Sequence, residues 1–153
     1  MASCISLYRV SRNKGTLGYK HEEVARFPKA SQFLNWIMKN VLQTSEIPSG
    51  GDEYEISKEQ LENLLEACIR TRRYGITYKR TRTHPSGNKE HLYMVNTEVA
   101  KNILPLYEKD GNLYFPSYYD IEYAQQIIDA IQSLNEILST TNFDRHKIMF
   151  SYH

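Results

Sequence analysis

The chain has 153 residues, 24% of them charged, and a formal net charge of only +1. This length suits one domain, residues 1–153, with a core that needs neither disulfides nor metal ions. No apolar run approaches the roughly 20 residues of a membrane span, and the N-terminus lacks the apolar region of a signal peptide. Two cysteines, Cys4 and Cys68, give neither a disulfide framework nor a metal-ligand pattern. We therefore expect a cytoplasmic protein with no membrane partner, metal or cofactor.

The first third of the chain predicts a strand followed by a helix. In residues 4–10, Ile5 and Leu7 alternate with Ser6 and Tyr8, as side chains on the two faces of a strand do. A helix is expected after Phe27-Pro28, because proline is tolerated in a first helical turn and apolar residues follow at helical spacing. Trp36 is one of these apolar residues, so we expect it in the core. Residues 44–51, with a proline and two adjacent glycines, predict a loop.

A capped helix with a basic C-terminal end follows. Ser57 and Gln60 have the spacing of a capping box, in which two side chains satisfy the first free amides of a helix. An apolar stripe lies behind the cap and places Cys68 in the core. Arginines at 70, 72 and 73 come at the end of this helix, where the helix dipole stabilises positive charge. The dipole explains these arginines structurally, so we expect function from the arginines of the next strand first.

The stretch between Glu66 and Glu90 contains no acidic residue. Its basic residues are Arg70, Arg72, Arg73, Lys79, Arg80, Arg82 and Lys89. Residues 76–83 predict a β-strand, because β-branched and aromatic side chains dominate. Strict alternation would place Tyr78, Arg80 and Arg82 on one face, with Thr77, Lys79 and Thr81 on the other. With a turn at 84–88 and a returning strand at 90–95, residues 74–95 predict a basic hairpin suited to an anion.

The last third predicts a short helix and then a long one. Asn96 can cap the short helix, which Pro105 closes, and residues 109–112 predict a tight turn before a short strand at 113–115. Ser117 or Asp120 can cap the long helix. The apolar residues 147–152 predict a strand inside the sheet, because an exposed edge of this kind promotes aggregation. The fold class is α+β: a small mixed or antiparallel sheet, two or three long helices packed on it, and a basic β-hairpin.

Catalytic motifs are not evident in the sequence. It contains no nucleophile elbow, no phosphate-binding loop and no dinucleotide fingerprint. Among the five histidines, only His84 and His91 could meet, across the hairpin, to bind a metal. His146, between Arg145 and Lys147, is a candidate general base beside a phosphate. We expect binding rather than catalysis, while an enzyme whose site is built from dispersed residues stays an alternative.

Two groups of segments outside the hairpin carry a recognisable pattern. The first comprises residues 26–37, 54–61 and 64–68, where Lys29, Ala30 and Trp36 match, and the second comprises residues 104–105 and 114–123 with the helix behind them. These segments resemble a group of small, functionally uncharacterised proteins encoded by tailed phages and prophages. The chain departs from that group at Pro28, Ser31, Leu34 and Pro116. The resemblance implies a phage setting, with the host cytosol as the compartment, and the hairpin looks like an addition to it.

Small phage proteins without catalytic motifs often counter host defences, and some sequester nucleotide second messengers. The leading hypothesis is therefore sequestration of a phosphorylated nucleotide, linear or cyclic, that signals host defence. Arginine and lysine would bind the phosphates and an aromatic ring would stack on the base. The expected ligand-binding residues are Tyr78, Lys79, Arg80, Arg82, Lys29, Tyr118 and Tyr119. They would meet within one chain or across a homo-oligomer.

Two other readings use the same hairpin. One is an inhibitor that binds a host defence protein. The other is a nucleic-acid-binding protein, against which the net charge of +1 argues, because dedicated nucleic-acid binders usually carry a more basic domain.

Overall fold

The computed structural model describes residues 4–13, 22–113 and 118–153. Its strands are β1 (Cys4–Ser11), β2 (Glu22–Pro28), β3 (Glu53–Ile56), β4 (Ile76–Thr83), β5 (Lys89–Val95), β6 (Glu108–Lys109), β7 (Asn112–Leu113) and β8 (His146–Tyr152). Its helices are α1 (Ser31–Ile37), which continues into the π-helix η1 (Met38–Leu42), then α2 (Lys58–Gly75), α3 (Thr97–Ile103) and α4 (Ile121–Thr140). The α+β class is confirmed.

The main sheet has the antiparallel order β2-β1-β8-β3. The C-terminal strand β8 therefore lies between two partners, as its apolar sequence predicted. Leu7 of β1 pairs with Phe150 of β8, and both side chains are buried. The two chain ends lie side by side, because the Cys4 amide donates to the His153 carbonyl at 2.6 Å and the His153 amide donates back at 3.0 Å.

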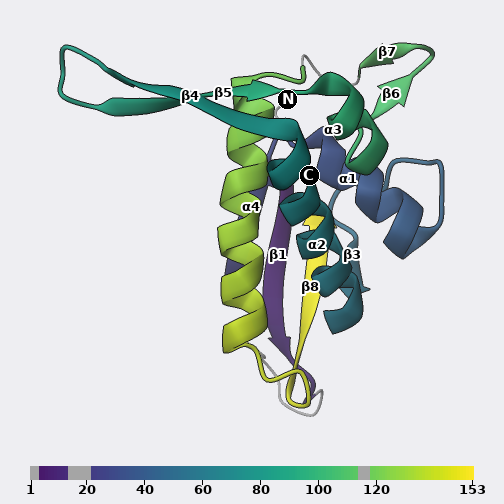
Figure 1. Ribbon diagram of the computed structural model, residues 1–153. Helices are drawn as coiled ribbons and strands as arrows, with labels where there is room; N and C mark the ends of the chain where they lie inside the picture. The colour runs from purple at the N-terminus through teal and green to yellow at the C-terminus, as the bar shows by residue number, and fades with distance from the viewer. Residues whose placement is uncertain (1–3, 14–21, 114–117) are drawn as a thin grey trace.

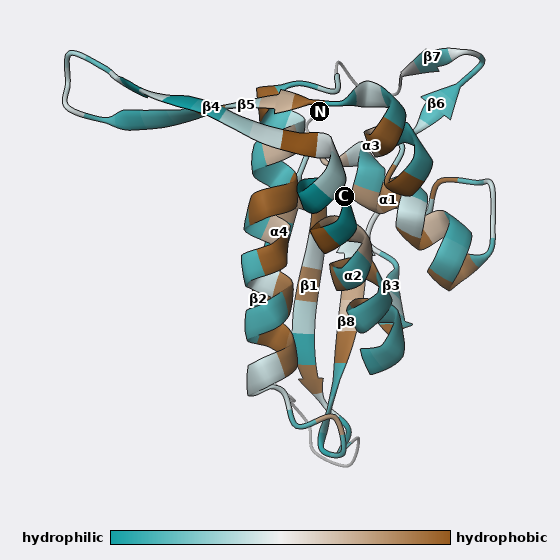
Figure 2. Ribbon diagram, in the orientation of Figure 1, coloured by the Kyte–Doolittle hydropathy of each residue, from teal (hydrophilic) through white to brown (hydrophobic). Residues whose placement is uncertain are grey.

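Helices α2 and α4 run antiparallel to each other and cover one face of this sheet (Figure 1). The shared core includes Leu7, Ile148 and Phe150 from the sheet, Leu61, Leu64 and Cys68 from α2, and Tyr123, Ile127 and Leu134 from α4. Each fully buried leucine or isoleucine contributes about 1.5–3 kcal/mol relative to exposure. Figure 2 shows hydrophobic bands along both helices and the central strands.

Side-chain caps begin the three helices that the sequence predicted to have them. The Ser57 hydroxyl accepts from the Gln60 amide at 3.1 Å and the Gln60 side chain accepts from the Ser57 amide at 2.8 Å, which confirms the capping box. Asn96 accepts from the Val99 amide at the start of α3. Asp120 is the cap of α4, since its carboxylate accepts from the amides of Glu122 and Tyr123; Ser117 lies outside the described residues.

The helix expected to follow Phe27-Pro28, with the proline near its first turn, begins only at Ser31. Pro28 ends β2, the edge strand of the sheet, where a missing backbone N–H is tolerated. Lys29 then adopts a left-handed backbone with φ of 57°, and α1 begins only at Ser31. The strand expected at 113–115 is described only as far as Leu113, and Tyr114 and Phe115 lie outside the described residues.

Strands β4 and β5 form a two-stranded hairpin, here called the arm (residues 76–95). The arm crosses α4 near its N-terminal end and extends beyond it, away from the sheet and helices (Figure 1). Its base carries the apolar residues Ile76 and Val95, which pack on the core, while the rest of β4 is exposed. None of the helices in the described part of the chain combines the length and the apolar character that a membrane span requires.

Candidate functional site

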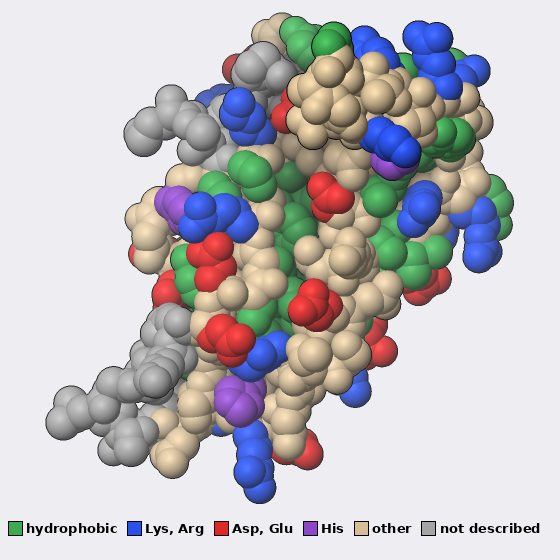
Figure 3. Space-filling model, turned by 90° about the vertical axis from the view of Figure 1, so that its left-hand side faces the viewer, with side chains coloured by type: hydrophobic (Ala, Val, Ile, Leu, Met, Phe, Trp, Pro, Cys, Tyr) green, Lys and Arg blue, Asp and Glu red, His purple; other side chains and the backbone are tan. Residues whose placement is uncertain are grey.

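Positive charge is concentrated where α2 meets the arm. Residues 70–95 contain seven Lys and Arg and one Glu, so this region carries +6, and the other residues together carry −5. In Figure 3, which looks at the side from which the arm projects, Lys and Arg side chains gather at the upper end of the molecule. The small net charge therefore conceals a strongly asymmetric distribution. An anionic ligand is attracted to one end of the protein.

A groove with a volume of about 430 Å³ lies at the base of the arm, and we call it the hairpin-base groove. Three elements line it: α2, the first residues of the arm with their partner strand, and α4. Its lining residues are Ile69, Arg72, Arg73, Ile76, Tyr78, Tyr93 and Ile131. The groove therefore combines two guanidinium groups, two phenol rings and three isoleucines.

The junction between α2 and β4 sets the geometry of this groove. α2 ends at Gly75 and β4 begins at Ile76, with no loop between them. Gly75 is buried against Val99 of α3, and a Cβ at this position would lie 3.1 Å from the Val99 Cγ1 atom. The Gly75 carbonyl also accepts a hydrogen bond from the Asn96 amide at 2.7 Å. These contacts hold the last turn of α2 against the N-terminal end of α3, which directly follows the arm.

A β-bulge decides which side chains of β4 face the groove. Tyr78 pairs with Tyr93, and the next paired residue of β4 is Arg80, opposite Leu92, so Lys79 is the additional residue. Thr81 consequently shares a face with Tyr78 and His91, whereas Arg80 and Arg82 share the other face with Leu92 and Glu90. The prediction that Tyr78, Arg80 and Arg82 lie on one face is therefore wrong, because strict alternation does not hold across a bulge.

The two tyrosines of the groove are arranged edge to face. Their ring centroids are 5.9 Å apart with an interplanar angle of 68°. Tyr78 is 53% exposed, so much of its ring is open to a ligand, while Tyr93 is half-buried. Aromatic pairs of this geometry support each other by roughly 0.5–1.5 kcal/mol, which orders the exposed ring in the absence of ligand.

The arginines of the groove differ from Arg82 of the arm in their partners, whereas Arg80, like them, forms no ion pair with another described residue. Neither Arg72 nor Arg73 forms an ion pair with another described residue, and both are exposed. Arg82, in contrast, forms an ion pair with Glu90, and His84 meets the same carboxylate at 3.0 Å. These two hydrogen bonds lower the pKa of Glu90 below its usual range. The charge of Arg82 is thus already compensated, whereas the charges of the helix-end arginines are not.

The remaining predicted residues lie away from the groove. Lys79, Arg80 and Arg82 are exposed along the arm, and Tyr78 is the one predicted residue in the groove lining. Lys29 occupies the connection between β2 and α1. Tyr118 is 62% exposed just before α4. The structure does not bring these residues together with Tyr78 around one hollow.

Tyr119 has a structural role at the start of α4. Its hydroxyl accepts from the Leu106 amide at 2.9 Å, and its ring lies 5.2 Å from that of Tyr123. The Lys101 ammonium lies 5.9 Å from the centre of the Tyr119 ring. Burial raises the pKa of the Tyr119 phenol, which stays neutral at physiological pH.

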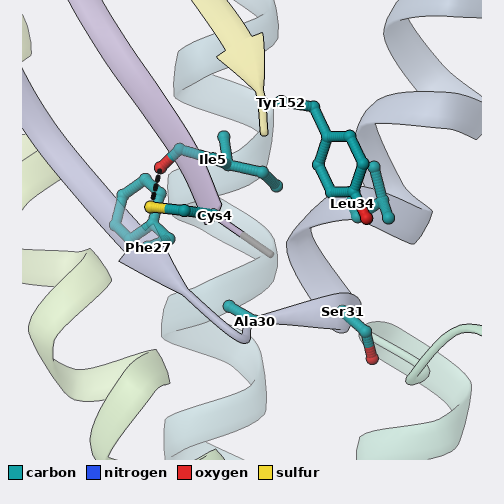
Figure 4. A pocket seen from close by; sticks show the side chains of 7 residues that line it. All are labelled: Cys4, Ile5, Phe27, Ala30, Ser31, Leu34 and Tyr152. Atoms are coloured by element: carbon teal, nitrogen blue, oxygen red, sulfur yellow. Dashed lines mark hydrogen bonds between the residues drawn. The ribbon is translucent and has the colours of Figure 1, made fainter. Parts of the chain in front are cut away.

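Other hollows in the described part of the chain suit a nucleotide less well. The space enclosed by Cys4, Ile5, Phe27, Ala30, Ser31, Leu34 and Tyr152 has a volume of about 10 Å³, enough for one water molecule at most (Figure 4). A hollow between β2 and α4 is lined by three glutamates, Glu22, Glu23 and Glu136, and by one arginine, Arg9, which pairs with Glu22. The excess of negative charge repels an anion. No group of three or more metal-ligating side chains occurs among the described residues.

Sequence reasoning missed Arg72, Arg73 and Tyr93. The arginines were credited to the helix dipole, which explains their stability but leaves their guanidinium groups available. A signal that could have found the arginines is their position in the last turn of a helix that runs directly into the strand bearing Tyr78. Comparison with protein-family models, curated proteins and solved structures gives no match to this chain.

Proposed function

We propose that the protein binds a small phosphorylated nucleotide in the hairpin-base groove. The observation that carries this proposal is that Arg72 and Arg73 line the same groove as the rings of Tyr78 and Tyr93 and three isoleucines. Guanidinium groups bind phosphate oxygens in bidentate fashion, and a tyrosine ring offers an apolar face and a hydroxyl to a base. The volume of about 430 Å³ lies within the range of small-molecule sites.

The lining of the groove favours binding without chemical conversion. None of its seven described side chains is a carboxylate, a histidine or a cysteine, the usual general bases and nucleophiles. β8, which begins at His146, starts at the end of the sheet opposite the arm, so the candidate base is remote from the groove (Figure 1). These features support sequestration of a linear or cyclic nucleotide signal of host defence, the role that the phage resemblance suggests.

Two matched double variants test the proposal. Titration calorimetry with mononucleotides, dinucleotides, cyclic nucleotides and ADP-ribose identifies the ligand in the unmodified protein. Arg72→Gln/Arg73→Gln should then weaken binding by at least about tenfold, because a hydrogen bond to a charged group contributes roughly 1.5–3 kcal/mol. Arg80→Gln/Arg82→Gln removes the same charge from the arm and should leave the affinity nearly unchanged. The proposal would be contradicted if the protein bound none of these nucleotides. It would also be contradicted if only the Arg80→Gln/Arg82→Gln variant lost affinity.

A second candidate function is nucleic-acid binding along the arm. The observation that favours it is that β4 is exposed from Thr77 to Thr83 and projects its basic residues into solvent. Two-stranded ribbons of this kind can enter a nucleic-acid groove. Fluorescence anisotropy with labelled oligonucleotides at low and physiological salt tests it, because binding to several phosphates weakens by orders of magnitude over that range. A salt-dependent affinity that Arg80→Gln/Arg82→Gln abolishes would support this candidate instead.

A further inference from the structure

A second groove, about 400 Å³ in volume, lies between α1 with η1, α2 and α3, and we call it the amide groove. Its polar lining residues are Asn40, Gln60, Asn63, Glu66, Arg70 and Asn102. It shares no residue with the hairpin-base groove. The following inference therefore does not rest on the proposed function.

One face of α2 forms the floor of the amide groove. Asn63, Glu66, Ala67 and Arg70 recur at spacings of three and four residues, so their side chains lie on one side of the helix. Ala67 is the small residue in the middle of this stripe. Its short side chain leaves space between longer polar neighbours, and the groove is hollowed there.

Each of three elements presents an asparagine to the groove: Asn40 from η1, Asn63 from α2 and Asn102 from α3. The side chains of Asn63 and Asn102 make no hydrogen bond to another described residue. Asn40 donates one N–H to the Trp36 carbonyl at 2.9 Å. Its second N–H and its side-chain oxygen therefore stay available to bond a ligand. An amide both donates and accepts, so the three asparagines supply the groove with donors as well as acceptors.

Glu66 and Arg70 add an acceptor and a fork of donors. They are spaced for an ion pair across one helical turn, yet neither pairs with the other or with another described residue. Their charges cancel within the groove. An anion would meet the Glu66 carboxylate, a cation would meet the Arg70 guanidinium, and a single carboxylate does not make a metal site.

Trp36 forms an aromatic wall of the amide groove. One part of its indole packs against the core, and the residue is half-buried rather than enclosed. It was predicted to be a core residue, and its contact with the core is confirmed, but it also faces this hollow. An indole offers a broad apolar face on which the C–H side of a sugar ring can pack, together with an N–H donor.

We propose that the amide groove binds a neutral saccharide, with one sugar ring against Trp36 and its hydroxyls bonded by Asn63, Asn102 and the Glu66 and Arg70 side chains. Hydroxyls donate and accept, as the amides do, and a neutral ring creates no uncompensated charge beside Glu66 or Arg70. The volume suits a ligand of one or two rings. Free sugars and the ribose of nucleosides share this chemistry, so both are tested.

The chain contains one tryptophan and twelve tyrosines, so emission excited selectively through the tryptophan reports on this groove. The experiment titrates the full chain with glucose, galactose, N-acetylglucosamine, their disaccharides and uncharged nucleosides, each to about 10 mM, ten times a 1 mM dissociation constant. We expect a saturable change in emission with at least one sugar. A response to nucleosides but not to sugars would overturn the saccharide assignment, and no saturable response to any of them would overturn the site.

Single variants locate the binding. Asn63→Ala and Asn102→Ala should each raise the dissociation constant about tenfold, since each removes hydrogen bonds to the ligand. Asn135→Ala, an exposed asparagine of α4 that does not line the groove, is the matched control and should not change it. Circular dichroism checks that the variants fold, which is expected because both positions are exposed. Equal affinity in all three variants would overturn the proposal.

Discussion

The hydroxyl of Tyr78 is hydrogen-bonded to the hydroxyl of Thr81, although the two residues are three apart in one β-strand. Residues three apart in a regular strand lie on opposite faces. Here the bulge at Lys79 inserts one residue, and Thr81 joins Tyr78 on the face that also bears His91, whose ring nitrogen contacts the Thr81 hydroxyl at 3.0 Å. The bulge thus separates the aromatic, groove-facing side of the arm from its arginine-bearing side.

Deletion of Lys79 should leave nucleotide binding in place. Without the additional residue, Tyr78 still pairs with Tyr93, Arg80 with Leu92 and Thr81 with His91, so each side chain keeps its face. The deletion removes one positive charge from the arm and none from the groove. Calorimetry should give a dissociation constant within about threefold of the unmodified protein, a free-energy difference below 1 kcal/mol. A loss of tenfold or more would mean that the ligand contacts the part of the arm beyond the groove.

Local patterns predicted the parts of the fold that depend on local physics. The capping box at Ser57, the turn of the arm and the apolar β8 strand each follow from a few neighbouring residues. Strands β2 and β3 were missed, because they are edge strands with exposed glutamates and form only by pairing with β1 and β8. Long-range pairing of this kind leaves little periodicity in the sequence.

In the candidate site, too, sequence reasoning found what depends on neighbouring residues and missed what depends on residues distant in the chain. Tyr78 was chosen because it is the aromatic residue of the predicted basic strand; it lines the groove, and its role in binding stays a prediction. The residues that share a face with Tyr78 depend on the bulge, and the groove that Arg73 lines is completed by Ile131 of α4, a residue from a distant part of the chain. Neither relationship is encoded in a short motif, so sequence reasoning assigned the ligand to the arm and credited the arginines of α2 to the helix dipole.

Gly75 should not tolerate a side chain. Gly75→Ala places a Cβ 3.1 Å from Val99 Cγ1, and a β-branched residue in a helix has few other rotamers to adopt. We expect a loss of about 1 kcal/mol in the free energy of unfolding, because overpacking outweighs the helix propensity of alanine. Urea denaturation measures this. Nucleotide affinity should fall too, since this junction orients Arg73 relative to Tyr78.

Two further variants show whether the contact with Val99 is the cause. Val99→Ala in the Gly75→Ala background should recover part of the lost stability, because it removes the atoms that crowd the new Cβ. Gly50→Ala is the control: its Cβ would meet only the Tyr152 carbonyl oxygen, at 3.9 Å, and its effect should stay within about 0.5 kcal/mol. Independent, additive effects at positions 75 and 99 would contradict this account.

The order of the arm tip should depend on pH through Glu90. Hydrogen bonds from Arg82 and His84 lower the pKa of Glu90 in the folded arm. A carboxylate whose folded-state pKa is lowered contributes stability that is present above its unfolded pKa, near 4.3, and is lost as the pH falls through the lowered value. Amide chemical shifts of residues 84 and 86–90 should therefore change in acid below about pH 4.3, while those at the groove should not. Glu90→Gln should abolish this pH dependence; an unchanged profile in that variant would assign the transition to another group.

Tyr123 should contribute stability through its buried hydroxyl and lose that contribution in alkali. The hydroxyl donates to the Leu104 carbonyl at 2.8 Å, and Tyr123→Phe should cost about 1–3 kcal/mol because it leaves this buried acceptor without a donor. Tyr118→Phe, at a 62% exposed position, is the control and should have little effect.

The burial of the Tyr123 phenol is tested by the pH dependence of the difference in unfolding free energy between the unmodified protein and Tyr123→Phe. Burial raises the pKa of Tyr123, so the folded protein keeps a proton that the unfolded chain loses near pH 10. Stability from this group is therefore complete below about pH 10 and declines as the pH rises further. In urea denaturation, the difference in unfolding free energy between the unmodified protein and Tyr123→Phe should shrink from pH 9 to about pH 11. A constant difference over this range would mean that Tyr123 ionises as readily in the folded protein as in the unfolded chain, and that its hydrogen bond to Leu104 opens to solvent.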